Sequence, residues 1–307
     1  MKRLFQIIAF TFCINLSAQS IIFSRSNGVL NSGSTLDLMI YDPIKKTTKL
    51  LLSGTVGGRG EYNAVVSPDN KKIIFNTYRF SGWKLAIADF KDNKISNVKR
   101  FTSRPNYEYN PNFSSDGSKV AYQEFSWNTR DVDVFIADNN GNNAVHFIKS
   151  DGGDRSPDWA RDSKSIIFTS ARNYDYSIYS KSLLDKKVKQ LTDKGAQDFA
   201  PSTSKTEDKI AFLSDRSGKI NLYMMNLDGT NIKNLTPNLK TDNFNFDGYE
   251  NSGCWAYKTS WSPNSKQIVF NALVNGNLEI FVVNSDGSGL VQITDNNDTD
   301  MAPSWIN

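Results

Sequence analysis

Residues 156–168 read SPDWARDSKSIIF, and this stretch decides the fold because its parts recur along the chain. A segment that starts with proline and ends in an aromatic residue is followed by a polar turn, and then by a β-branched pair with a second aromatic residue. β-Branched and aromatic residues favour strands, whereas Asp, Asn, Ser and Gly favour tight turns. The stretch therefore predicts a short strand that turns back into a longer, apolar one.

The apolar strand of this unit recurs at intervals of 44 to 58 residues. Its copies end at Phe23, Phe75, Tyr122, Phe168, Phe212 and Phe270. In each copy a second strand follows, then a hairpin turn such as Asn140-Gly141, and then an outer strand that ends in a pair such as Leu191-Thr192. Repeats of about 40–50 residues with four strands are typical of propeller blades. The sequence predicts an all-β, six-bladed β-propeller with four-stranded antiparallel blades.

The two ends of the repeat region carry complementary parts of one blade. The first apolar strand, residues 20–23, has no inner strand before it, and the last inner strand, Pro303-Ser304-Trp305, has no strand after it. Pairing them completes the sixth blade and covers two open sheet edges, where unpaired backbone groups favour aggregation. We expect one domain over residues 19–307, closed by pairing of its N- and C-terminal strands.

Residues 1–18 have the pattern of a signal peptide. Lys2 and Arg3 precede an apolar run over residues 4–16, and the small residue Ala18 stands before Gln19. The run is shorter than the roughly 20 residues that a membrane-spanning helix needs. We expect cleavage after Ala18 and a periplasmic or secreted monomer that does not span the membrane.

The composition argues against several classes of protein. The 36 basic and 32 acidic residues give a formal net charge of +4, which indicates no concentrated basic face for nucleic acid. The single histidine, His146, argues against most metal hydrolases and Ser-His-Asp sites. Two cysteines form neither a disulfide framework nor a structural zinc site.

The repeat units over residues 156–168 and 212–218 resemble those of the TolB-like propeller family, whose repeat is also called WD40-like or PD40. Leu235-Thr236 matches the end of the family's outer strand, and residues 227–230 match its hairpin. The resemblance covers nearly all of residues 20–307 and implies a six-bladed propeller. TolB of the Tol-Pal system carries an additional α/β domain before its propeller. Since nothing of that kind fits between Ala18 and Ser20, we expect a stand-alone propeller.

Five acidic residues occupy one position of the repeat, three residues before the proline position of the inner strand. They are Glu61, Glu108, Asp154, Asp198 and Asp300. The next position usually holds a large residue: Tyr62, Tyr109, Arg155, Phe199 and Tyr257. Inner strands line the channel of a propeller, so equivalent positions lie at one height. We predict that these residues form a ligand-binding ring at one mouth of the channel.

A ring of carboxylates must spread apart, take up protons or hold a cation, because like charges at close range disfavour joint ionisation. Calcium and magnesium prefer oxygen ligands. Glu108, Asp154 and Asp198 are therefore candidate ligands for a Ca²⁺ ion in the channel. The other interpretation is that each acid accepts hydrogen bonds from an adjoining loop or blade as a packing feature.

The longest interval between repeats contains residues 237–255, which are rich in polar and aromatic side chains. Long loops in compact domains are often functional. This one joins an outer strand to the next inner strand, so we expect it at the same mouth as the carboxylate ring.

Two functions remain open. The first is an exported, non-catalytic binding or scaffold propeller that docks a protein segment or a glycan of the cell envelope at the acidic mouth. The alternative is a glycan hydrolase or lyase that uses pairs of channel carboxylates for acid–base catalysis. We expect the first, because no set of nucleophile and base is visible in the sequence.

Overall fold

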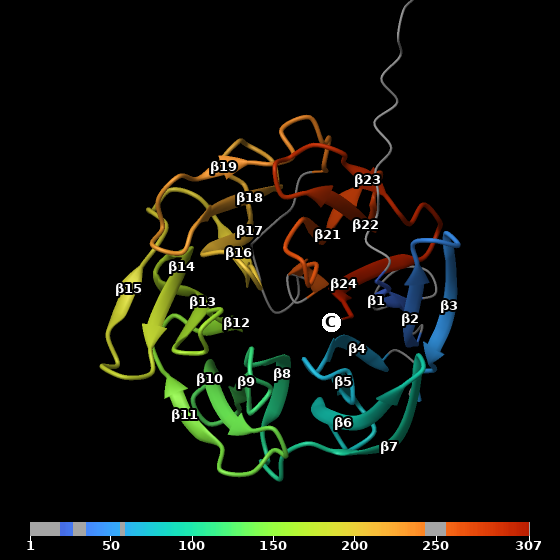
Figure 1. Cartoon of the computed structure of the whole chain (residues 1–307). Coiled ribbons are helices and arrows are strands. Elements are labelled where there is room, and N and C mark those ends of the chain that lie inside the picture. Colours follow the sequence, from blue (N-terminus) through green and yellow to red (C-terminus); the bar gives the residue numbers. More distant parts are fainter. Residues whose placement is uncertain (1–18, 27–34, 56–58, 243–255, 307) are drawn as a thin grey trace, which may run out of the picture.

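The computed structural model describes residues 19–26, 35–55, 59–242 and 256–306. In this part of the chain, six sheets of four antiparallel strands follow one another in a ring around a common axis (Figure 1). The protein is thus an all-β, six-bladed propeller, as predicted. No helix within these ranges is long and apolar enough to cross a membrane.

Each blade is one sheet that runs from an inner strand at the channel to an outer strand at the edge of the ring. Blades 1 and 2 are β24 (Thr299–Trp305), β1 (Ile21–Ser26), β2 (Leu36–Asp42), β3 (Thr47–Leu52), and β4 (Glu61–Val66), β5 (Lys72–Thr77), β6 (Lys84–Lys91), β7 (Lys94–Arg100). Blades 3 and 4 are β8 (Tyr107–Phe113), β9 (Lys119–Ser126), β10 (Asp131–Asp138), β11 (Val145–Ile148), and β12 (Asp154–Trp159), β13 (Ser165–Asn173), β14 (Asp175–Ser182), β15 (Val188–Gln190). Blades 5 and 6 are β16 (Asp198–Thr203), β17 (Lys209–Ser214), β18 (Asn221–Asn226), β19 (Lys233–Asn234), and β20 (Thr259–Trp261), β21 (Gln267–Val274), β22 (Asn277–Asn284), β23 (Val291–Gln292).

Blade 1 closes the ring by joining the two ends of the described chain. Strand β1 pairs antiparallel with β24, with Ile21 opposite Trp305 and Arg25 opposite Asp300. Beyond the strands, the Ile306 N–H donates to the carbonyl of Ser20 at 3.0 Å. The predicted pairing of the N- and C-terminal strands is confirmed.

The repeated aromatic residue lies within the second strand of each blade, where it is fully buried and faces a partner on the next strand. Phe168 lies opposite Tyr179 and stacks on it at 5.8 Å, and Phe212 lies opposite Tyr223 at 5.9 Å. Clusters of buried apolar residues join neighbouring blades, for example Ile74 of blade 2 with Tyr122 of blade 3. The repeated aromatic residue is therefore a core residue of each blade, and burial between blades holds the ring together.

Each inner strand except β20 contains a bulge two residues after its carboxylate. The residues there have left-handed backbone angles, with φ between 48° and 53°: Asn63, Asn110, Ser156, Ala200 and Ala302. The strand register shifts at the same point. A bulge bends the strand and redirects a side chain, so each of these inner strands changes direction at this level of the channel wall.

Candidate functional site

The five predicted carboxylates lie at or near the starts of the inner strands, and all five are fully buried. Four of them form ion pairs with an arginine that lies at the end of the second strand of the same blade or two residues after it. The pairs are Glu61–Arg79 at 2.8 Å, Asp154–Arg172 at 2.7 Å, Asp198–Arg216 at 2.8 Å and Asp300–Arg25 at 2.7 Å. Each of these carboxylates is thus neutralised within its own blade.

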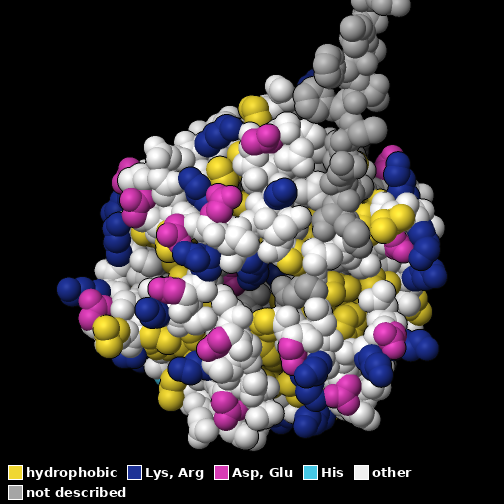
Figure 2. Space-filling model, in the orientation of Figure 1, with side chains coloured by type: hydrophobic (Ala, Val, Ile, Leu, Met, Phe, Trp, Pro, Cys, Tyr) yellow, Lys and Arg dark blue, Asp and Glu magenta, His cyan; other side chains and the backbone are white. Residues whose placement is uncertain are grey.

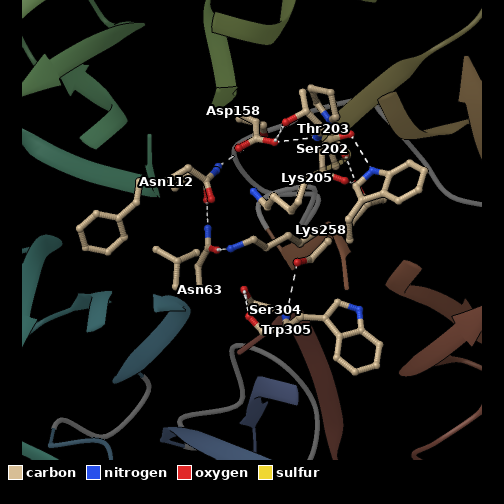
Figure 3. A pocket seen from close by; sticks show the side chains of 18 of the residues that line it. Asn63, Asn112, Asp158, Ser202, Thr203, Lys205, Lys258, Ser304 and Trp305 are labelled. Carbon is tan, nitrogen blue, oxygen red and sulfur yellow. Dashed lines mark hydrogen bonds between the residues drawn. The ribbon is translucent and has the colours of Figure 1, made fainter. Parts of the chain in front are cut away.

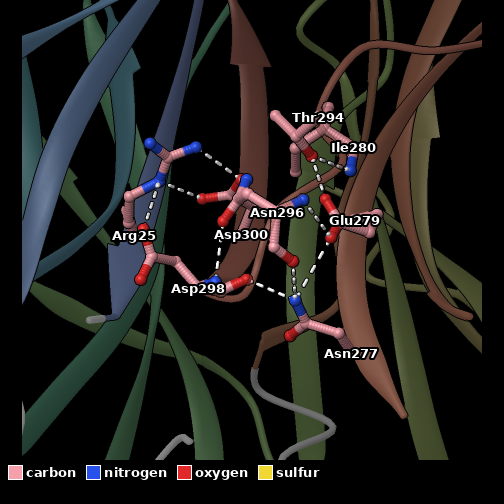
Figure 4. Close-up of polar contacts among 8 residues, drawn as sticks. All are labelled: Arg25, Asn277, Glu279, Ile280, Thr294, Asn296, Asp298 and Asp300. Carbon is pink, nitrogen blue, oxygen red and sulfur yellow. Dashed lines mark hydrogen bonds and ion pairs between the residues drawn. The ribbon is translucent and has the colours of Figure 1, made fainter. Parts of the chain in front are cut away.

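Asp300 shows how completely such a carboxylate is engaged (Figure 4). Arg25 donates from Nε to Oδ1 and from Nη2 to Oδ2, both at 2.7 Å. The Asn296 amide donates to Oδ2 at 2.9 Å. Two parallel hydrogen bonds from one guanidinium are the strongest form of such a pair. No oxygen of Asp300 is left without a donor.

Glu108 is held by hydroxyl and backbone donors instead. Thr102 Oγ1 donates to Oε1, and the Leu85 N–H donates to Oε2 at 3.3 Å. Burial raises the pKa of Glu108, and the nearby carboxylate of Glu124 raises it further. The five carboxylates therefore have the contacts that the packing interpretation requires.

The large residues of the predicted ring pack against other aromatic side chains, within a blade or between two blades. Tyr62 is buried edge-on against Trp83 at 5.1 Å, and Tyr109 lies edge-on to Tyr107 at 6.4 Å. Phe199 contacts Tyr257 edge-on at 5.7 Å.

Arg155 pairs with Thr169 in the ladder between β12 and β13. Together with the buried carboxylates, these residues lie where the inner strands begin.

The described residues contain no group of three or more His, Cys, Asp or Glu side chains that could hold a metal ion. Glu108, Asp154 and Asp198 stand in three different blades, and each is turned to partners of its own. The structure does not gather them as a Ca²⁺ site would require. Of the long loop over residues 237–255, residues 243–255 lie outside the described part, so its predicted place beside the ring stays a prediction.

A cavity of about 340 Å³ occupies the channel at the other end of the inner strands. All six inner strands contribute to its wall, and the turns that follow them form its rim, with Pro68, Ser115 and Pro263. Of the ten predicted site residues, Tyr257 lines this cavity and the other nine do not. The carboxylate ring and the cavity are at different levels because the inner strands all start at one face and end at the opposite one.

The side chains at the bulge level form a hydrogen-bonded chain at the floor of the cavity. Lys258, which precedes β20, donates from Nζ to Asn63 Oδ1 at 2.5 Å. The Asn63 amide donates to Asn110 Oδ1, and the Asn110 amide donates to Gln123 at 2.9 Å and to Ser156 Oγ at 3.5 Å. Lys258 stands at the repeat position where the other inner strands have Asn, Ser or Ala, so it brings a charge into an otherwise neutral ring.

Of the residues that the structure describes, three charged ones line the cavity, and the side chains of Lys205 and Lys258 extend into it (Figure 3). The third is Asp158, whose Oδ2 accepts hydrogen bonds from the Thr203 N–H at 2.7 Å and the Thr203 hydroxyl at 3.1 Å. Burial lowers the pKa of Lys258, the charge of Asp158 raises it and the charge of Lys205 lowers it, and together they bring this pKa to about 7. On the side drawn in Figure 2, basic side chains lie next to the central hollow.

Hydrogen bonds between blades fix the wall of the cavity. The indole N–H of Trp159 donates to the Asn112 carbonyl and that of Trp261 donates to the Ser202 carbonyl, both at 3.1 Å. The Asn112 amide returns a hydrogen bond to Pro157 at 2.8 Å. These contacts hold neighbouring inner strands together, so the cavity is formed without a ligand.

The arginines, the bulge residues and the two lysines were not predicted as site residues. One signal was available, since an arginine follows the acid by 18 residues in three repeats, at Arg79, Arg172 and Arg216. Lys258 carries a signal as well, because it is a charged residue at a position that is uncharged in every other repeat.

Comparisons with known proteins place this propeller in a family. The profile of the TolB beta propeller domain (PD40) matches residues 77–250, more than half of the chain. The chain belongs to the TolB β-propeller family. The Tol-Pal system protein TolB of Francisella tularensis is 24% identical over 165 residues, which are 50% of this chain and 38% of that protein. This propeller therefore matches well under half the length of that relative.

Solved structures of TolB proteins share the fold. TolB from Acinetobacter baumannii superposes with a TM-score of 0.75 at 20% identity, over 94% of this chain and 66% of that one. A putative TolB from Agrobacterium tumefaciens superposes with a TM-score of 0.65 at 14% identity, over 95% of this chain and 100% of that one. At these identities the likeness concerns the fold, and family membership supports a binding or scaffold role in general terms.

Proposed function

We propose that this TolB-family propeller is a non-catalytic binding protein of the cell envelope that docks a segment of a partner protein in the channel cavity. The observation that carries the proposal is the cavity itself, which is preformed, open at the turn side and lined by hydrogen-bonding groups from all six blades. The relative from Francisella tularensis bears the name of a protein of a multi-component system, which agrees with a role in assembly.

The same proposal includes export and a monomeric state. The basic start and apolar run of residues 1–18 support export to the periplasm or the medium, although these residues lie outside the described part. Cell fractionation of the full chain and of a chain lacking residues 2–18 tests the export. Accumulation of both chains in the cytoplasm would reject it, and size-exclusion chromatography tests the monomer.

A glycan hydrolase or lyase is less well supported. Such enzymes generally use two carboxylates that face the same space. Among the described residues that line the cavity, Asp158 is the only acidic one, and Thr203 already donates two hydrogen bonds to it. The ring carboxylates at the other level are buried, and they are held by arginines or, in the case of Glu108, by hydrogen-bond donors.

Site-specific photo-crosslinking tests the docking. Ser115 is an exposed residue on the rim of the cavity, and Leu50, which is 55% exposed, lies on the outer strand of blade 1. With a benzophenone amino acid at either position in cells of the native host, we expect a discrete crosslinked partner from position 115 and none from position 50. Crosslinks of equal yield at both positions, or at position 50 alone, would contradict the proposal.

A further inference from the structure

We infer that the docked segment presents a carboxylate to Lys258 and Lys205, so that the cavity selects acidic peptide segments. This inference rests on the proposed function and names the chemistry of its ligand. It starts from the charges that the described residues bring to the cavity wall, which are two ammonium groups and one carboxylate. The carboxylate is held by Thr203, and the ammonium groups have no acidic partner within ion-pair distance among the described residues.

Lys258 is the more informative of the two lysines. Its ammonium lies inside the channel, and its contact is the neutral amide oxygen of Asn63 at 2.5 Å. Lys258 is half-buried. An ammonium partly removed from water without a counter-charge is unfavourable, and an incoming carboxylate offsets that cost. An ammonium has three donors. The contact with Asn63 therefore leaves donors of Lys258 for a ligand.

The remaining wall favours a peptide over a free anion or a sugar. Apolar groups of Val65, Val66 and Phe113 line the same space and would be left unused by a small inorganic ion. The indoles of Trp261 and Trp305 are only 2% and 3% exposed, so they offer no open face on which a sugar ring could stack. Neutral donors and acceptors such as Ser202 and Asn112 suit a peptide backbone.

The protonation of Lys258 gives this site a distinct pH dependence. The groups that act on its charge are Asp158 of β12 and Lys205, which follows β16. With a pKa of about 7, Lys258 is charged below that pH and neutral above it. Affinity for a carboxylate ligand should therefore fall as the pH rises from 6 to 8, whereas affinity for a neutral ligand should not.

The test uses two fluorescent decapeptides, one of alternating Glu and Gly and one of alternating Gln and Gly, with binding to the full mature chain measured by anisotropy. We expect the Glu peptide to bind about tenfold more tightly at pH 6, which corresponds to one hydrogen-bonded charge. Lys258→Met should remove most of that difference and flatten the pH dependence, and Lys205→Met should weaken binding to a smaller extent. Lys233→Met is the matched control, because Lys233 is exposed on β19 and contacts the Asp286 carbonyl. This substitution should leave the affinity for both peptides unchanged.

Several results would overturn the inference. Equal affinity for the two peptides, no binding of either at millimolar concentration, or an unchanged affinity in Lys258→Met would each do so. Displacement of the Glu peptide by inorganic phosphate at equal concentration would indicate a site for small anions, and tighter binding of polygalacturonate would indicate a glycan site. If Lys258→Met melts far below the wild-type protein, the inference is tested by the affinity of Lys205→Met and by the pH profile of the wild-type chain. A partner crosslinked at position 115 without carboxylate selectivity would leave the proposed function standing and reject this inference.

Discussion

The arginine–carboxylate pairs at the starts of the inner strands are the residues whose loss should affect stability most. In the pair of Arg216 and Asp198, the carboxylate is fully buried and the arginine is 25% exposed. Removing one partner of a buried pair leaves an uncompensated charge, which typically costs about 3–5 kcal/mol. The arginines therefore prevent these buried carboxylates from destabilising the folded protein.

Arg216→Met should lower the free energy of unfolding by about 3 kcal/mol, measured by urea denaturation. The matched control is Arg161→Met, because Arg161 pairs with Asp208 at the surface, with exposed fractions of 47% and 65%. Loss of such a surface pair should cost less than about 1 kcal/mol. Equal losses of unfolding free energy in the two variants would show that the buried pair stabilises the fold no more than the surface pair does.

Asp133 should give the stability of the protein a measurable pH dependence. Burial raises the pKa of Asp133 to about 6, although His146, at 3.0 Å from its Oδ2, lowers it. A carboxyl whose pKa is higher in the folded state disfavours folding once it ionises, so its unfavourable contribution is absent below about pH 4 and complete above about pH 6. Asp133→Asn should thus raise the melting temperature by a few degrees at pH 7.5 and have little effect at pH 4. A larger gain at pH 4 than at pH 7.5 would contradict this assignment.

At the scale of the strand, the bulges shape the channel wall. Ala200 is buried and lines the cavity with a φ of 51°, an angle that disfavours β-branched side chains in particular. Ala200→Val should lower the free energy of unfolding by about 2 kcal/mol or more. Ala200→Gly keeps the backbone angle and should stay within about 1 kcal/mol of the wild type. A Val variant as stable as the Gly variant would show that the bulge is not required.

The strands were predictable from the sequence, whereas the bulges and the site were not. Alternating apolar residues and turn formers locate each hairpin, as in residues 156–168, because these signals are local. A bulge at Ala200 or Ser156 leaves no mark in the hydrophobic pattern. The acids at Asp154 and Asp198 were correctly placed on inner strands, but their role depends on arginines 18 residues away in sequence, which adopt their positions only in the folded blade.

At the scale of the whole molecule, closure of blade 1 keeps the six inner strands around one cavity. Strand β24 supplies the buried residues Met301 and Trp305 to that blade, and its loss would expose the edge of β1. Because closure joins the two ends of the repeat region, it could be predicted from the half-blades at Phe23 and Trp305.

A chain lacking residues 299–307 should lose cooperative unfolding and aggregate at room temperature. The control is a circular permutant in which a short linker joins residues 306 and 19 and the new ends follow Leu184, which is 93% exposed. This permutant should melt within a few degrees of the wild type, since Ile306 and Ser20 are already hydrogen-bonded neighbours. A truncated chain that unfolds like the wild type would contradict ring closure as the basis of stability.

The claim that the partner docks at the turn side of the channel is tested most directly by hydrogen–deuterium exchange of the full mature chain with and without its crosslinked partner. We predict slower exchange in the segments that form the cavity and its rim, residues 63–68, 110–115 and 200–205. Protection confined to the loops at the opposite end of the strands, residues 78–83 and 127–130, would contradict the account.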